Sequence, residues 1–141
     1  MIIRPDEFIA IDKYHYDNTF KKLCPSEKGL KKNEVIFNKY AQLFVYSCIV
    51  GYLEDGLEPI EKRENQIRWQ AIDSKAQARL IALSVAKFDG IDIIKDATLL
   101  KNDFEQRSNY GMKIINKNMT IDNIDYRSFN SFLTQLINTA S

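Results

Sequence analysis

Few side chains in this sequence have the types and spacing that chemistry requires, and the single histidine is the most reactive of them. His15 lies between Tyr14 and Tyr16, and an imidazole with an ordinary pKa of about 6.5 can act as an acid, a base or a pH-sensitive contact. Nucleophilic catalysis needs a nucleophile beside a base that a third group orients. No Ser, Cys or Asp pattern marks such partners, so we interpret His15 as an ordinary surface or boundary histidine and predict no catalytic residue.

Acidic side chains recur at a spacing that a metal ion could use. Glu58, Glu61 and Glu64 are three residues apart, which on a helix would align their carboxylates for a divalent cation. Pro59 argues against a continuous helix at this point, and a magnesium site generally also uses substrate phosphates and octahedral geometry. We interpret the three glutamates as part of a solvated segment.

The cysteines do not form the pattern of a zinc site. Cys24 and Cys48 are the only two cysteines, the chain has one histidine, and no CxxC spacing occurs. A tetrahedral zinc site needs more ligands of these types than the chain offers. The sequence therefore predicts no metal and no cofactor.

A lysine-rich region near the N-terminus supports one hypothesis, which is nucleic-acid binding. Lysine contacts to phosphates give salt-sensitive binding without sequence preference, whereas a helix-turn-helix reader needs a polar recognition helix. The strongest helical patterns here are too apolar for that role. The candidate nucleic-acid-binding residues are Lys21, Lys22, Lys28, Lys31 and Lys32.

A second cluster supports a different hypothesis, which is protein binding. Arg63, Arg68 and Trp69 lie close together in the sequence, and Trp and Arg dominate the energetic hot spots of protein interfaces. Alternatively, Trp69 closes the core beside the central helix. The sequence leaves both interpretations of Trp69 open.

The elements that position these side chains are predicted to be mostly helical. The chain has 141 residues, of which 45% are hydrophobic, and this suffices for one core without disulfides or metals. We predict one all-α domain over residues 1–141, built as a compact bundle of five or six helices around a buried central helix from about residue 34 to 54. Residues 57–72 lose the helical period and predict a short extended or hairpin strap, which we call the strap.

The other predicted elements follow from caps and periodicity. Ser74 is a good N-cap for a helix that ends before Gly90. Further apolar periods predict helices over 98–116 and 126–137, whereas residues 1–32 form a helical segment followed by a loop.

Targeting signals are not visible in the sequence. The longest apolar run, residues 43–53, is much shorter than the roughly 20 residues that span a bilayer. The N-terminus carries Arg4, Pro5 and acidic residues where a signal peptide needs an apolar stretch. Two reduced cysteines also suit the cytosol, so we expect a cytoplasmic protein without membrane contact.

The order of motifs resembles that of a known family. The motifs are a central helix ending in a Gly-aromatic pair (IFNKYAQLFVYSCIVGYL), a PIEK step, an Ile-Arg-Trp segment, an Ala/Leu-rich helix (ARLIALSVAKFDG) and a Phe-Glu helix with an internal glycine (NDFEQRSNYGMKII). In this order they resemble the small DNA phosphorothioation-associated proteins of type 4. The matching positions are Phe44, Gly51, Tyr52, Pro59, Ile60, Trp69, Phe104, Glu105 and Gly111.

The resemblance implies a place in a bacterial antiphage or DNA-modification and restriction system. It implies a non-catalytic accessory subunit that docks on a larger nuclease, ATPase or modification protein of the same locus, with at most non-specific DNA contact. No catalytic residue is carried over. The alternative from the residues themselves is a small nucleic-acid-binding module that uses the lysine-rich region.

Overall fold

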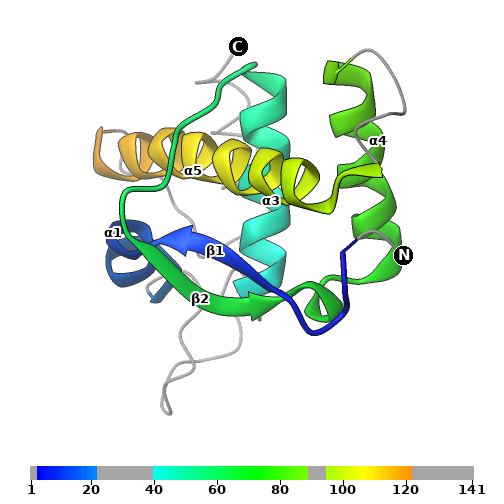
Figure 1. The fold of residues 1–141 in the computed structure, drawn as a ribbon. Coiled ribbons are helices and arrows are strands. Elements are labelled where there is room, and N and C mark those ends of the chain that lie inside the picture. The colour runs from blue at the N-terminus through cyan, green and yellow to red at the C-terminus, as the bar shows by residue number, and fades with distance from the viewer. Residues whose placement is uncertain (1–2, 22–39, 89–94, 122–141) are drawn as a thin grey trace.

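The computed structural model describes residues 3–21, 40–88 and 95–121 (Figure 1). The elements in chain order are β1 (Phe8–Asp12), α1 (Lys13–His15), the π-helical turn η1 (Tyr16–Phe20), α3 (Tyr40–Leu53), β2 (Arg63–Arg68), the 3-10 turn η3 (Trp69–Ala71), α4 (Ser74–Phe88) and α5 (Ala97–Ile121). The predicted helix at 126–137 lies outside the described residues. No helix in the described ranges is long and apolar enough to cross a membrane.

The prediction of an all-α bundle is wrong, because β1 and β2 pair as a two-stranded antiparallel sheet. The fold is a small mixed α/β fold. In the described part of the chain it has four α-helices, one of them a single turn, rather than five or six. The N-terminal segment was predicted to be helical, but Ile9, Ala10 and Ile11 are all buried in a strand. A short apolar run buried on both faces has no period that distinguishes a strand from a helix.

The strap contains the second strand, but not as part of a hairpin. Its partner is β1, in a register that pairs Phe8 with Arg68 and Asp12 with Arg63. A bulge between Ile9 and Ala10 in this pairing leaves Gln66 without a partner residue. The sheet therefore joins two segments that are far apart in the sequence.

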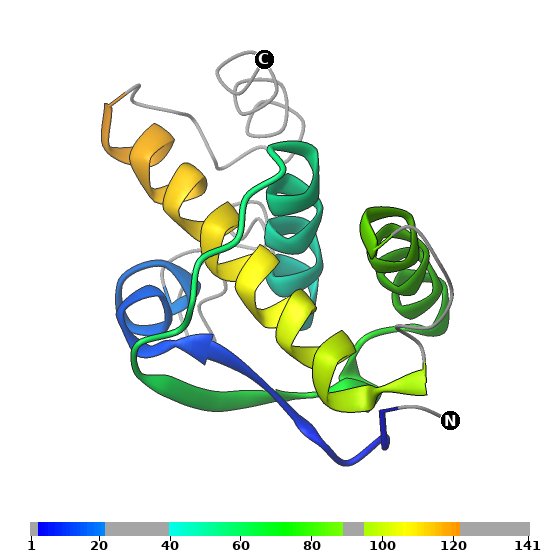
Figure 2. The same cartoon turned by 45° about the horizontal axis from the view of Figure 1, so that its top comes forward.

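Helices α3 and α5 cross in direct backbone contact and form the centre of the fold. Figure 2 shows α5 lying across α3, with both strands on the same side of α5. A Cβ on Gly51 would lie 2.7 Å from the carbonyl carbon of Arg107, and a Cβ on Gly111 would lie 2.8 Å from that of Ser47. Real Cβ atoms do not approach so closely, so glycine is required at both positions for this crossing.

The sheet is attached to α5 by one buried carboxylate. Glu105 is 2% exposed, and its Oε2 accepts a 2.6 Å hydrogen bond from the backbone N–H of Ala10. Arg63 donates to both oxygens of the same carboxylate, at 3.2 and 3.0 Å. Glu105 thus links α5 to both strands at once.

Candidate functional site

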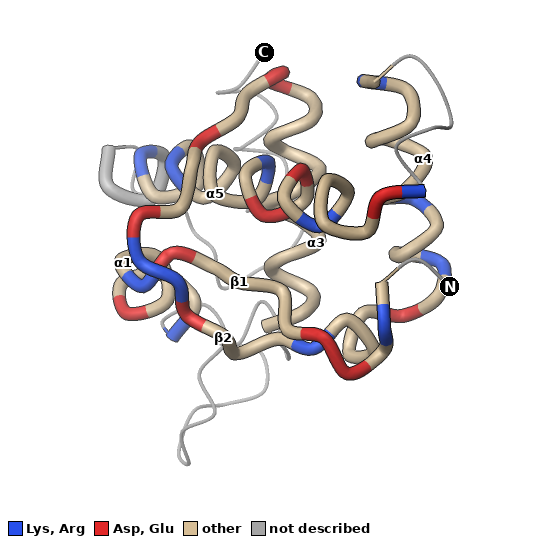
Figure 3. Tube along the Cα trace, viewed as in Figure 1, with Lys and Arg blue, Asp and Glu red and all other residues tan. Residues whose placement is uncertain are grey.

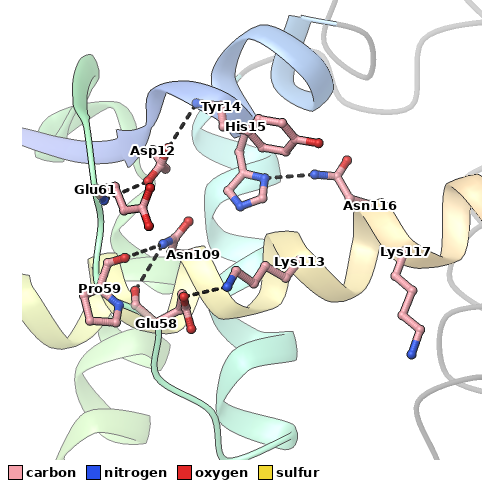
Figure 4. A pocket seen from close by; sticks show the side chains of 10 residues that line it. All are labelled: Asp12, Tyr14, His15, Glu58, Pro59, Glu61, Asn109, Lys113, Asn116 and Lys117. Atoms are coloured by element: carbon pink, nitrogen blue, oxygen red, sulfur yellow. Dashed lines mark hydrogen bonds and ion pairs between the residues drawn. The ribbon is translucent and has the colours of Figure 1, made fainter.

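A hollow of about 500 Å³ lies where the end of β1, the strap and α5 meet (Figure 4). Four of its lining residues come from α5, namely Asn109, Lys113, Asn116 and Lys117. Side chains three or four residues apart share one face of a helix, so these four continue the face on which Glu105 lies. The remaining lining residues are Asp12, Tyr14, His15, Glu58, Pro59 and Glu61.

His15 forms part of the floor of the hollow. Asp12 holds the local backbone, since its carboxylate accepts from the N–H of Tyr14 at 3.0 Å and from the N–H of Glu61 at 2.9 Å. His15 is 5% exposed, and its Nδ1 lies 2.9 Å from the amide nitrogen of Asn116. Because an amide nitrogen donates, Nδ1 accepts and the proton of the neutral ring is on Nε2. Figure 4 shows that second ring nitrogen facing the side of Asn109 and Lys113.

The surroundings of His15 keep its ring neutral. Burial lowers the pKa of His15, the charge of Asp12 opposes this effect, and the charge of Lys113 adds to it. A positive imidazolium is disfavoured in a desolvated place. His15 can therefore donate a hydrogen bond from Nε2 at neutral pH without carrying a charge.

Asn109 forms the other part of the floor and has an unpaired oxygen. It is 4% exposed, and its Nδ2 donates to the carbonyl oxygens of Glu58 at 3.2 Å and Pro59 at 3.0 Å. Both amide hydrogens are thereby used, so the remaining atom is the acceptor Oδ1. This atom is buried and has no hydrogen-bond partner among the described residues. Such a buried acceptor costs about 1 to 3 kcal/mol.

Charged side chains line the rim of the hollow. Lys113 Nζ and Glu58 Oε1 form an ion pair at 2.5 Å, and both side chains are exposed enough that the pair contributes little stability. Within the described part of the chain, no group of three or more His, Cys, Asp or Glu side chains could hold a metal ion.

The three predicted partner-binding residues occupy different environments. Arg63 is half exposed, with its guanidinium paired to Glu105. Arg68 lies on the surface, where its guanidinium is 4.5 Å from the ring centre of Phe8 and one nitrogen donates to the carbonyl of Asp6 at 3.1 Å.

Trp69 lies in the core. It is 2% exposed, and its ring stacks on Phe104 with centroids 5.6 Å apart and planes 4° apart. The structure therefore places Trp69 where the second interpretation of the sequence put it, and its ring is not available on the surface.

Of the predicted nucleic-acid-binding residues, the structure describes Lys21 only. Its Nζ is 3.5 Å from Asp17 and 4.9 Å from the ring centre of Tyr16. The other four, Lys22, Lys28, Lys31 and Lys32, lie outside the described residues. Binding through this region stays a prediction.

Cys48 and Asp103 are of reactive residue types, but their hydrogen bonds hold helices together. Cys48 is fully buried and its thiol donates to the carbonyl of Phe104 at 3.2 Å, while burial and nearby carboxylates raise its pKa. Asp103 accepts from Ser84 at 2.7 Å and also from Tyr52. These contacts tie α3, α4 and α5 together rather than forming a reactive pair.

Comparison with protein-family models, curated proteins and solved structures gives no match. The function must be argued from the geometry. Sequence reasoning missed Asn109 and Asn116, although one signal was present: polar residues at 105, 109, 113 and 116 follow the helical spacing of a single face. Their contacts depend on a strap and a strand that the helical period does not reveal.

Proposed function

We propose that the protein is a non-catalytic interaction subunit that docks on a larger protein through the outer edge of β2. The observation that carries this proposal is the edge itself. β2 is exposed at four of its six residues, and within the described ranges its only strand partner is β1. A free strand edge is a common site for adding a strand from another protein.

The backbone groups that face outward can be identified from the pairing. The N–H of Ala10 bonds to Glu105 and not to β2, so the pair Ala10–Asn65 is a non-hydrogen-bonded pair of the ladder. The N–H of Lys13 does bond to Lys62 across the sheet, at 2.9 Å. Hydrogen-bonded and non-hydrogen-bonded pairs alternate along an antiparallel ladder, so Asp12–Arg63 is also a non-hydrogen-bonded pair. The backbone N–H and C=O groups of Arg63 and Asn65 therefore point away from β1.

The same alternation holds on the other side of the bulge. The N–H of Trp69 donates to the carbonyl of Glu7 at 2.8 Å, so the next pair, Phe8–Arg68, is again non-hydrogen-bonded. The outer edge thus offers backbone groups of Arg63, Asn65 and Arg68.

The charges of the edge favour a different protein over a second copy of this chain. Figure 3 shows both signs of charge along the strap and β2. Antiparallel pairing of two copies through the outward groups of Arg63 and Asn65 would place Glu64 opposite the Glu64 of the second copy, and like charges directly opposite are destabilising. A partner strand with a basic residue opposite Glu64 and acidic residues near Arg63 and Arg68 avoids this.

The non-catalytic character is supported by the lining of the hollow. Among the described residues, neither a serine nor a cysteine lines it, and His15 bonds to an amide rather than to a nucleophile or a carboxylate. Combined with the family resemblance of the sequence, this supports an accessory subunit of a bacterial antiphage or DNA phosphorothioation-linked system. The proposal places the protein and its partner in the cytoplasm.

The test is co-purification of a tagged chain from its native host, with Asn65→Pro and Asn65→Ala as a matched pair. Proline removes the outward N–H of Asn65 without removing a bond to β1, and an edge position tolerates it. Alanine keeps that N–H. We expect a larger protein to be recovered at high salt with wild type and Asn65→Ala, and lost with Asn65→Pro.

Three results contradict the proposal. These are equal recovery of the partner with the proline variant, isolation of the wild type as a lone monomer, and recovery of nucleic acid alone at low salt only. The last result would favour the lysine-rich region instead. The thermal midpoint of Asn65→Pro, measured beside wild type, verifies that the variant is folded.

A further inference from the structure

The lining of the hollow includes no residue of β2, and the size of the hollow suits a small molecule. Its volume of about 500 Å³ is within the range of roughly 300 to 1,000 Å³ that ligand sites occupy. Asn109 and Lys117 mark its two ends on α5. With a rise of about 1.5 Å per residue, they are about 12 Å apart along the helix axis.

The floor of the hollow presents one acceptor and one donor. The acceptor is Oδ1 of Asn109, which is buried without a partner among the described residues. The donor is Nε2 of His15, because Nδ1 already accepts from Asn116. In Figure 4 the Asn109 end lies beside Glu58, Pro59 and Glu61, whereas Lys117 is at the opposite end.

The charged side chains that have no partner within the described part of the chain have opposite signs at the two ends of the hollow. Lys113 and Glu58 neutralise each other, and both oxygens of Asp12 accept backbone N–H groups. Glu61 contributes only its backbone N–H to these contacts. Among the described residues, the carboxylate of Glu61 and the ammonium of Lys117 have no partner.

We infer that the hollow binds a small zwitterion of dipeptide to tripeptide length, with its ammonium group toward Glu61 and Asn109, a peptide carbonyl toward His15 and its carboxylate toward Lys117. An ammonium donates to both Glu61 and the unpaired Oδ1 of Asn109, a peptide carbonyl between the two ends accepts from Nε2 of His15, and the carboxylate accepts from Lys117. An extended tripeptide is about 10 to 11 Å long, which matches the separation of the two ends. This site is independent of the proposed docking edge.

The test is an NMR titration of the full chain with three matched probes: triglycine, N-acetyl-triglycine and triglycine amide. The first is a zwitterion, the second lacks the ammonium and the third lacks the carboxylate. We expect triglycine to bind at least tenfold more tightly than either blocked form. The shifted backbone signals should come from the strap and from the part of α5 around Asn109 to Lys117.

Two variants assign the two ends. Glu61→Gln should abolish the preference for triglycine over N-acetyl-triglycine, and Lys117→Gln should abolish its preference over triglycine amide. Lys101→Gln, a charge change on the same helix outside the hollow, should leave all three affinities unchanged. The inference is overturned when the three probes bind equally, when none shifts the signals at saturating concentration, or when Glu61→Gln and Lys117→Gln keep the wild-type preferences.

Discussion

Replacing Gly111 by alanine tests the central crossing of α3 and α5. In an isolated helix this change is favourable by about 1 kcal/mol, because alanine has the higher helix propensity. In the folded protein the new Cβ would lie 2.8 Å from the carbonyl carbon of Ser47 and closer still to its oxygen. The obstacle is backbone of another helix, so it cannot move aside as a flexible side chain would.

The two effects have opposite signs, and the steric effect is the larger. Overpacking a core typically costs about 1 to 3 kcal/mol, and a collision of two backbones belongs at or above the upper end of that range. After subtraction of the propensity gain of about 1 kcal/mol, we expect the free energy of unfolding to fall by about 2 kcal/mol. For a domain of this size that lowers the melting temperature by about 5 to 10 °C.

The assay is urea unfolding of Gly111→Ala beside wild type, followed by circular dichroism. Asn102→Ala is the matched control, since Asn102 is an exposed residue of the same helix and should gain about 0.5 kcal/mol from propensity alone. If Gly111→Ala is as stable as wild type or more stable, the two helices are not in backbone contact and the reasoning is refuted.

Three further predictions concern single residues. Burial lowers the pKa of His15 from its ordinary value of 6.5, so the unfolded chain binds a proton more readily than the folded one. Stability should therefore fall as the pH drops below 6.5 toward the lowered folded value, and urea unfolding of His15→Gln should show a smaller loss between pH 7.5 and 5.5; an identical loss would contradict the assignment. Burial raises the pKa of Cys48, so in a Cys24→Ser background its thiol should resist a disulfide reagent at pH 8 until urea unfolds the chain, whereas rapid reaction of the native protein would show that the helix packing is open. Trp69, the only tryptophan, is 2% exposed. Its fluorescence should be blue-shifted and protected from iodide in the native state, and easy quenching would mean that the ring is on the surface.

The sequence alone determined the helices that carry their own local signals. The predicted start of α4 is off by one residue, because Ser74 is the first helical residue and the carboxylate of Asp73 caps the helix by accepting from the N–H of Ala76 at 3.0 Å. The apolar period predicted α5, which is a helix in the structure. A glycine inside an apolar helix, such as Gly51, indicates either a close helix crossing or the exit from the helix, and the contact with the backbone of Arg107 shows that Gly51 lies at a crossing. These features depend on residues within a few turns of one another, which is why a single segment is enough to reveal them.

Only the tertiary structure decided the sheet and the hollow. Ile9 and its neighbours form a strand because the strap lies beside them and Glu105 accepts a hydrogen bond from the free N–H of Ala10. The order of apolar and polar residues around Ile9 does not reveal either contact. Asn109 and His15 likewise share a floor only because α5 packs against the end of β1. Strand pairing and site assembly depend on contacts between segments that are distant in the chain, so no local period specifies them.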